Sequence, residues 1–175
     1  MSNKVLKVNN KVKTSSKKST SSFYNLKTEM NNNSVLDFEY LKNKKILIVN
    51  TASECGYTQQ YESLQQLHTQ MGERLTIIGF PSNDFAKQEQ RNDNQIEEFC
   101  KINFGVTFLL AKKSGVLKNE TQNEVFKWLT SKEQNGWNDS APKWNFCKYL
   151  IDETGNLIGV YQSGVNPLKI KELFL

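Results

Sequence analysis

The sequence predicts an α/β fold in which a central mixed β-sheet is flanked by helices and preceded by an N-terminal β-hairpin. The first observation is two apolar strand patterns with a helical pattern between them. Because strand–helix–strand connections almost always produce parallel pairing, this order predicts a parallel centre for the sheet. A second observation is a pair of strands near the C-terminus joined by a short turn, which predicts antiparallel pairing. With 175 residues, the chain suits one domain with an ordinary core and no disulfides.

The first half of the chain supplies the hairpin and the parallel strands. Residues 23–41 form two short strand patterns around the polar turn Met30–Asn33, which predicts the hairpin. Residues 44–52 (KKILIVNTA) and 75–81 (LTIIGFP) are continuous apolar runs typical of strands covered on both faces. Between these runs, apolar side chains recur at helical spacing up to Gly72, namely Tyr61, Leu64, Leu67 and Met71.

The second half predicts two further helices, a second hairpin and a closing helix. Residues 94–104 place Ile96, Phe99 and Cys100 on the inner face of a helix, and residues 119–132 read as another helix. Residues 143–163 read as two strands around the turn Glu153–Asn156. Residues 166–174 close the chain as a helix with Pro167 near its first turn.

Basic charge is concentrated in residues 1–21, which hold six of the 23 lysines and arginines and no acid. The remaining 17 basic residues nearly balance the 18 acidic ones, so the domain at residues 22–175 carries no net basic character and we expect no nucleic-acid partner. Residues 1–21 lack the apolar run of a secretory signal or a membrane span. We expect a disordered, solvated arm on a cytoplasmic protein, with mitochondrial or other organellar targeting as the alternative, and leave membrane contact open.

Cys55 lies where the first buried strand gives way to helical spacing at Gly56–Thr58. Free backbone N–H groups and the positive end of the helix dipole would stabilise a thiolate there. The alternative is an inert buried thiol, since cysteine is among the most buried residue types. Cys100 lies on an apolar helix face and is interpreted as core filler, and three cysteines without an export signal suggest free thiols in a reducing compartment.

Several chemistries lack their residues. The strand–helix turn has no C-x-x-C pair for a dithiol relay. The single histidine, His68, falls in the middle of the first helix, where it is a surface or boundary residue rather than a base for a Cys–His hydrolase. No cysteines or histidines have the spacing of a zinc site, and neither phosphate-binding glycine motif is present, so we expect no metal and no bound cofactor.

Four ordered stretches carry a family resemblance: ILIVNTASECGYTQQY, GFPSNDFAKQE, EEFCKINFGVTF and KWNFCKYLIDETGN. Together they resemble the glutathione peroxidase family from about residue 22 to the C-terminus. The resemblance implies a thioredoxin-like fold, a role as an antioxidant oxidoreductase in the response to oxidative stress, and Cys55 as the nucleophile that attacks peroxide. It assigns Gln88, Trp144 and Asn145 as its catalytic partners.

Peroxide chemistry explains these residue types. A thiolate attacks one oxygen of hydrogen peroxide or of an organic or lipid hydroperoxide, becomes a sulfenic acid and expels water or an alcohol. The glutamine and asparagine NH₂ groups and the indole N–H are neutral donors that can stabilise the sulfur and the departing oxygen.

Departures from the family pattern bear on regeneration of the thiol. Ser82 stands where many members carry a resolving cysteine, so we expect glutathione, with thioredoxin as the alternative, to be the co-substrate that reduces the sulfenic acid. Strand alternation would turn Cys147 toward the same face as Asn145, which makes it a possible resolving thiol.

Ala86 and Lys87 replace a glycine pair, and Gln90 and Leu109 replace prolines, so the loop carrying Gln88 is expected to be stiffer or differently posed. The short segment 112–143 favours a monomer.

Two other functions compete with a peroxidase. A peroxide-sensing redox or binding module would keep Cys55 and turn over poorly without a resolving cysteine. A purely structural thioredoxin-like protein would need neither the thiol nor the donors. Retention of Gln88, Trp144 and Asn145 favours the peroxidase.

Overall fold

The computed structural model describes residues 10–14 and 17–174. Within these residues the central sheet has six strands in the order β1-β8-β7-β4-β5-β6. Its centre is formed by β4 (Lys45–Thr51) and β5 (Leu75–Pro81), which pair in parallel along their whole length. Strand β7 (Lys148–Ile151) pairs antiparallel with β4 on the other side. The predicted mixed sheet and its parallel centre are therefore confirmed.

The outer strands are short. Strand β8 (Leu157–Tyr161) pairs antiparallel with β7 and completes the predicted C-terminal hairpin. At one edge β1 (Asn10–Val12) pairs with β8, and at the other β6 (Leu109–Leu110) pairs with β5. The sequence analysis identified neither edge strand, because three or two residues are too few to show a period.

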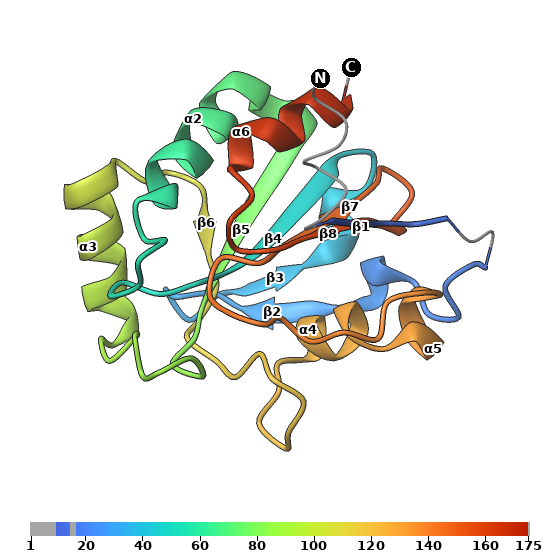
Figure 1. The fold of residues 1–175 in the computed structure, drawn as a ribbon, viewed down its shortest axis with the longest axis horizontal. Coiled ribbons are helices and arrows are strands. Elements are labelled where there is room, and N and C mark those ends of the chain that lie inside the picture. The colour runs from blue at the N-terminus through green and yellow to red at the C-terminus, as the bar shows by residue number, and fades with distance from the viewer. Residues whose placement is uncertain (1–9, 15–16, 175) are drawn as a thin grey trace.

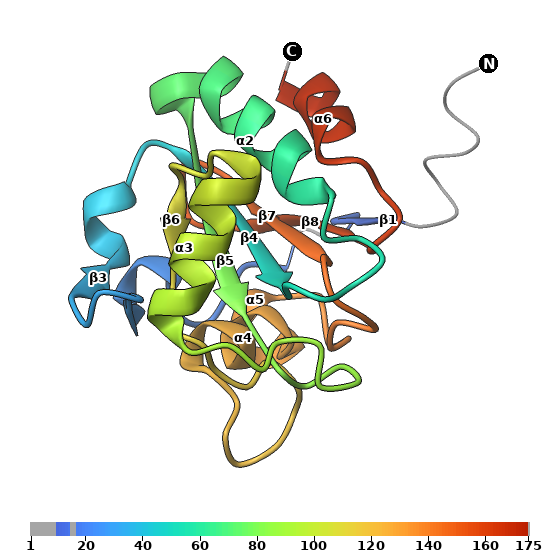
Figure 2. The same ribbon diagram turned by 90° about the vertical axis from the view of Figure 1, so that its left-hand side faces the viewer.

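One face of the sheet is covered by α2 (Gln60–Met71), α3 (Asp93–Phe104) and α6 (Pro167–Ile170), as Figures 1 and 2 show. Helix α3 begins with a capping box, in which the side chains of Asn92 and Gln95 each accept from the other's backbone N–H. It ends at Gly105, whose left-handed φ of 61° suits a glycine. These helices supply the apolar cluster that contains Cys55.

The opposite face is covered by α4 (Glu124–Leu129), α5 (Lys132–Asn135) and a separate two-stranded sheet. That sheet is the predicted hairpin, formed by β2 (Lys27–Glu29) and β3 (Val35–Asp37). The helix predicted over residues 119–132 is shorter and broken. Short 3₁₀ helices lie elsewhere in the described chain, at Phe23–Asn25, Phe38–Leu41, Gly72–Arg74 and Lys171–Phe174.

Strand β4 separates the two layers of core. Ile46 and Ile48 belong to the cluster on the hairpin side, whereas Leu47 and Val49 belong to the cluster on the α2 side. All four side chains are fully buried, as expected of a central strand with a continuous apolar sequence. The carboxyl end of β4 leads directly to Cys55, as the carboxyl end of a parallel strand does in sites of this architecture.

The N-terminal arm is not solvated throughout, contrary to the expectation for residues 1–21. Its described residues make tertiary contacts. In addition to the β1 pairing, Thr20 N donates to Gln134 O at 3.1 Å, and the buried Trp128 Nε1 donates to Ser21 O at 2.9 Å. The backbone of a polar arm can pair with a sheet edge and a helix end without burying any apolar side chain, which is why composition alone did not reveal these contacts. Residues 1–9 and 15–16 lie outside the described residues.

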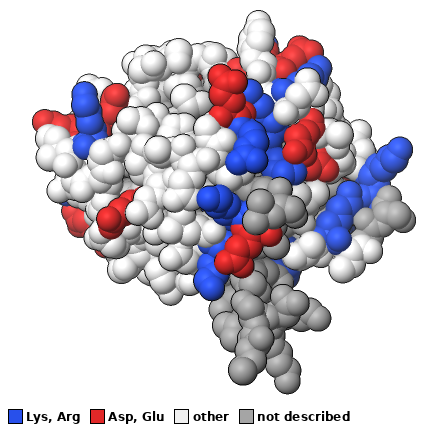
Figure 3. Space-filling model, turned by 90° about the horizontal axis from the view of Figure 1, so that it is seen from above, with Lys and Arg blue, Asp and Glu red and all other residues white. Residues whose placement is uncertain are grey.

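The surface mixes both signs of charge. On the face shown in Figure 3, Lys and Arg side chains are interspersed with Asp and Glu rather than gathered in one uniform patch. Within the described residues, no helix combines the length and the apolar character needed to cross a bilayer.

A pair of truncations tests the docking of the arm. Removal of residues 1–13 deletes a three-residue edge strand whose Val12 side chain is 58% exposed, so we expect little change in thermal stability. Removal of residues 1–21 also takes away the carbonyl of Ser21 and leaves the Trp128 N–H buried without an acceptor, a loss of about 1–3 kcal/mol. The longer truncation should therefore melt about 2–10 °C below the shorter one in a calorimetric scan. Equal melting temperatures would show that the Ser21 contact contributes nothing.

Candidate active site

Cys55 lies in a tight turn between β4 and α2. Its Sγ accepts a hydrogen bond from Tyr57 N at 3.4 Å, and its own N–H donates to Thr58 Oγ1 at 3.0 Å. The Thr58 hydroxyl in turn donates to Ala52 O at 2.8 Å, which closes the turn. Cys55 as a residue is 9% exposed, so it lies at the edge of the core.

Helix α2 begins at Gln60, later than the predicted start at Gly56–Thr58. The intervening residues form successive turns, in which Thr58 N donates to Cys55 O and Gln60 N donates to Tyr57 O. The backbone donor at the sulfur is therefore the Tyr57 N–H of this turn, not the first turn of the helix. The expected contact between Cys55 and backbone N–H groups is preserved by a different local geometry.

Gln88 lies in the loop between β5 and α3, and this loop runs beside the Cys55 turn. Glu54 N donates to Gln88 O at 3.0 Å, so the residue before Cys55 is paired with the backbone of Gln88. The two preceding residues, Ala86 and Lys87, adopt left-handed conformations with φ of 50° and 54°. These are the positions where the resemblance led us to expect glycines, and side chains at such φ values are strained.

Asn145 joins Gln88 directly. Its side chain is fully buried, and its Nδ2 donates to Gln88 Oε1 at 3.0 Å. Because the carbonyl oxygen of the Gln88 amide is occupied, its NH₂ group is the end left over, and it makes no hydrogen bond to the described residues. The indole N–H of Trp144 likewise has no acceptor within that part of the chain. Two neutral donors are thus without an acceptor among the described residues, and one of them belongs to the loop that is paired with Glu54.

Trp144 is half-buried and packs on both core clusters. Its ring lies 5.5 Å from the ring of Phe85 in a tilted arrangement. Phe85 belongs to the loop that carries Gln88, so this contact ties the Trp144 segment to that loop. Cys55 and Phe146 belong to the same cluster on the α2 side, against which Trp144 packs.

The segment that contains Trp144 and Asn145 is held by Asn50, a residue that the sequence analysis did not single out. The fully buried Asn50 amide donates to Trp144 O at 2.9 Å and accepts from Cys147 N at 3.0 Å. Between these contacts Phe146 takes a left-handed conformation with φ of 63°. The available signal was an asparagine directly after the apolar run Ile46–Val49.

Cys147 does not share a face with Asn145. Strand β7 begins only at Lys148, and the left-handed Phe146 breaks the alternation on which that prediction depended. Cys147 is fully buried in the cluster on the hairpin side, with its Sγ 3.7 Å from Ser163 Oγ. Cys55 belongs to the cluster on the other face of the sheet, so the structure does not bring the two thiols together.

Burial sets the ionisation of two groups near the site. The pKa of Lys148 falls to about 7 because its ammonium is desolvated, and its Nζ donates to Ser163 O at 3.0 Å. The pKa of the Cys100 thiol rises to about 11, again chiefly by desolvation. Cys100 is fully buried in the α2-side cluster, in agreement with its interpretation as core filler.

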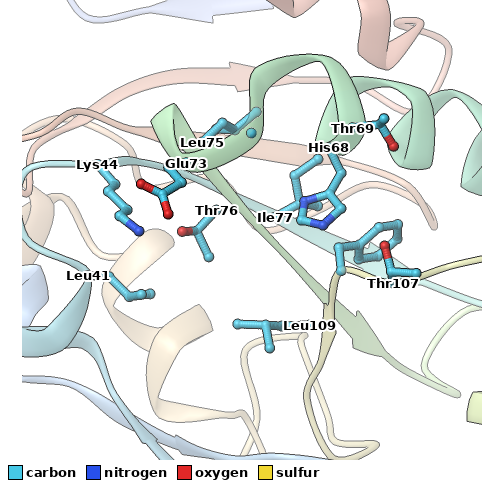
Figure 4. A pocket seen from close by; sticks show the side chains of 12 residues that line it. Leu41, Lys44, His68, Thr69, Glu73, Leu75, Thr76, Ile77, Thr107 and Leu109 are labelled. Carbon is cyan, nitrogen blue, oxygen red and sulfur yellow. The ribbon is translucent and has the colours of Figure 1, made fainter.

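A hollow of about 500 Å³ lies elsewhere, at the amino end of β5 (Figure 4). Lys44, Glu73 and Thr76 line one part of it and His68 another, and aliphatic side chains line the rest. Since Cys55 follows the opposite, carboxyl end of the parallel strands, this hollow is separate from the thiol site. His68 contributes to it from the outer part of α2, as a boundary residue.

Taken together, the fold and the geometry describe an α/β protein in which a turn carrying Cys55 follows the central strand β4 and is paired, through Glu54, with the loop of Gln88. The sequence profile of the glutathione peroxidase family matches residues 23–130. The chain belongs to the glutathione peroxidase family and is a thiol-dependent peroxidase, an oxidoreductase.

Similar proteins cover nearly the same length. Glutathione peroxidase-like peroxiredoxin 2 of Saccharomyces cerevisiae is 38% identical, over 87% of this chain and 94% of that protein. Glutathione peroxidase-like peroxiredoxin GPX5 of Chlamydomonas reinhardtii is 41% identical, over 85% and 91% of the two chains. The apo crystal structure of Trgpx is 31% identical, covers 89% of this chain and 94% of its own, and superposes with a TM-score of 0.69. The thioredoxin-like fold is thereby confirmed.

Glycine substitutions test the strain before Gln88. Relief of a left-handed side chain returns about 1–2 kcal/mol, and the added freedom of the unfolded chain removes about 0.5–1 kcal/mol of that gain. We therefore expect Ala86→Gly and Lys87→Gly each to raise the free energy of unfolding by up to about 1 kcal/mol in urea titrations. The matched control is Gln90→Gly in the same loop, which has no positive φ and should lower it. A loss of stability in all three variants would contradict the strain.

Proposed function

We propose that Cys55 is the peroxidatic nucleophile and that Gln88, Trp144 and Asn145 form its catalytic surroundings. The proposal depends most on one observation, the hydrogen bond from Asn145 Nδ2 to Gln88 Oε1. That bond orients the Gln88 amide with its NH₂ group free, in a loop whose backbone is paired with Glu54 next to the thiol. A donor fixed in advance needs no reorganisation when charge develops.

In the proposed reaction the Cys55 thiolate attacks one oxygen of hydrogen peroxide or of an organic hydroperoxide. The S–O bond forms as the O–O bond breaks, and the departing oxygen takes up a proton to leave as water or an alcohol. Cys55 becomes a sulfenic acid. The Gln88 NH₂ and the Trp144 N–H would stabilise the negative charge that passes from sulfur to the departing oxygen.

Glutathione is the proposed reductant, with thioredoxin as the alternative. Ser82 is fully buried and cannot form a disulfide, and Cys147 lies on the other face of the sheet. An external thiol would attack the sulfenic sulfur and release water, and a second thiol would then attack the mixed disulfide to return the Cys55 thiol and oxidised glutathione. A reducing compartment such as the cytoplasm suits this route, because all three cysteines are free, and the short segment 112–143 favours a monomer.

Single substitutions test the assignment of the site. Cys55→Ser should abolish peroxide consumption, because a hydroxyl does not replace the thiolate. Gln88→Ala and Trp144→Phe should each lower the second-order rate constant for peroxide, by up to the roughly 10²–10³-fold that loss of one such donor can cause. Phenylalanine retains the ring contact with Phe85 and removes only the N–H. Stopped-flow measurement of tryptophan fluorescence or of peroxide loss gives the rate constants.

The control for these variants is Cys100→Ser, which alters a buried thiol in the same core cluster. It should remain within about threefold of the original rate if the fold is intact. If peroxide consumption survives in Cys55→Ser and is lost in Cys100→Ser, Cys100 is the nucleophile and the proposal is rejected.

Intact mass after one equivalent of peroxide, without added thiol, tests the mode of regeneration. We expect a sulfenic or sulfinic acid on Cys55, followed by a glutathione adduct when glutathione is supplied. Cys147→Ser should behave in the same way, because its thiol packs in the cluster on the hairpin side of the sheet and Cys55 in the cluster on the α2 side. A rapid loss of two hydrogens with a Cys55–Cys147 peptide would instead establish an internal disulfide. Steady-state turnover with thioredoxin but not glutathione would decide for the alternative reductant.

A further inference from the structure

A buried carboxylic acid lies directly after Gln88. Glu89 is fully buried, and its Oε2 accepts a hydrogen bond from Ser53 Oγ at 2.7 Å. Its backbone N–H donates to Asn83 Oδ1 at 3.0 Å, while its Oε1 has no partner among the described residues. Desolvation raises the pKa of this carboxyl, and the hydrogen bonds from Ser53 oppose the rise. An acid kept in such an environment requires a structural or chemical reason, because glutamate is almost never fully buried without one.

The bond to Ser53 joins the two halves of the candidate site. Ser53 precedes Cys55 by two residues, and Glu89 follows Gln88 by one. Alongside it, Glu54 N donates to Gln88 O, so residues 53–54 and 88–89 lie paired. An ion pair between Arg91 and Glu54, with N and O 2.9 Å apart, spans the same two segments at the surface.

The two side-chain links, Arg91–Glu54 and Ser53–Glu89, differ in strength. The Arg91–Glu54 pair is solvent-exposed, with its side chains 31% and 54% accessible, and pairs of that kind contribute about 0–1 kcal/mol. The Ser53–Glu89 bond is shielded from water and involves an ionisable acceptor, which makes it the stronger constraint on the spacing of the segments. On its other side the Cys55 turn is already held by Thr58.

We propose that Glu89 is a positioning residue, which acts through Ser53 to set the Cys55 sulfur at its working distance from the Gln88 amide. The inference rests on the proposed function of Cys55 and Gln88. Without the bond, the Cys55 turn would remain closed by Thr58 but could move relative to the loop of Gln88. The thiol would keep its own reactivity, whereas the donor for the departing oxygen would be displaced.

The experiment compares Glu89→Ala, Glu89→Gln and Ser53→Ala in the full chain, with Arg91→Ala as the matched control on the same two segments. The first readout is the second-order rate constant of Cys55 oxidation by hydrogen peroxide. A second is the rate of Cys55 alkylation by iodoacetamide, which needs the thiolate and not Gln88. The third is hydrogen–deuterium exchange at the Glu54 amide in the reduced protein, which requires no peroxidase activity.

We expect Glu89→Ala and Ser53→Ala to lower the peroxide rate constant by about 10–100-fold, the range associated with misplacement of a catalytic group. Glu89→Gln should stay within about threefold, because its amide oxygen still accepts from Ser53. The double variant should be no slower than Glu89→Ala, since that substitution already removes the acceptor of every Ser53 hydrogen bond. Alkylation should change little, Glu54 exchange should quicken, and Arg91→Ala should resemble the original protein.

Unchanged peroxide rates in folded Glu89→Ala and Ser53→Ala would overturn the inference. So would equal losses in the peroxide and alkylation rates, which would indicate general loosening of the thiol. If Glu89→Ala does not fold, the peroxide rate constant of Ser53→Ala tests the inference, because this substitution is a small change at the same bond. An original protein that does not react with peroxide at all would count against the proposed function, and the exchange at Glu54 would still decide whether Glu89 holds the segments together.

Discussion

The side-chain amide of Asn50 is the contact on which the rest of the site depends. It lies at the carboxyl end of β4 and spans two backbone groups of the facing segment, the carbonyl of Trp144 and the N–H of Cys147. Backbone bonds from Asn50 N to Cys147 O and from Phe146 N to Asn50 O complete the junction. A left-handed phenylalanine is disfavoured by roughly 1–3 kcal/mol, and this set of buried hydrogen bonds offsets that strain.

That junction allows three separate parts of the chain to share one site. The left-handed Phe146 turns Asn145 toward Gln88, while Phe146 itself packs in the cluster that contains Cys55. Gln88 belongs to a different segment, the loop between β5 and α3, whose backbone is paired with Glu54. Under the proposed function, the groups of this site are a thiol and neutral amide and indole donors, and the described residues place no cation in hydrogen-bond contact with them. Electrostatic assistance then depends on orientation, which is why buried amide contacts matter more here than net charge.

The parts that the sequence predicted are those with a local period or a buried run. The apolar spacing of residues 44–104 predicts strands β4 and β5 and helices α2 and α3. The same spacing predicts the position of Cys55 in the connection that follows β4. Strands β1 and β6 could not be predicted, because pairing with β8 and β5 forms them and no side-chain pattern does. The placement of Cys147 failed for a related reason, since one left-handed residue reverses the alternation and no local signal marks Phe146 as that residue.

Ser82 lies in the loop that carries Gln88, and hydrogen bonds to neighbouring segments hold this loop in place. A resolving thiol at position 82 would have to travel to Cys55, and the loop after β5 would have to open. Here Ser82 N donates to Thr51 O, and Asp84 Oδ2 accepts from the N–H groups of Val116 and Leu117 at 2.6 and 3.0 Å. Opening the loop would break these bonds and also detach Gln88, whose N–H donates to Phe85 O. Under the proposed function, a serine at this position makes no demand on the loop to open, so these bonds can hold the loop in place while Gln88 acts as a donor.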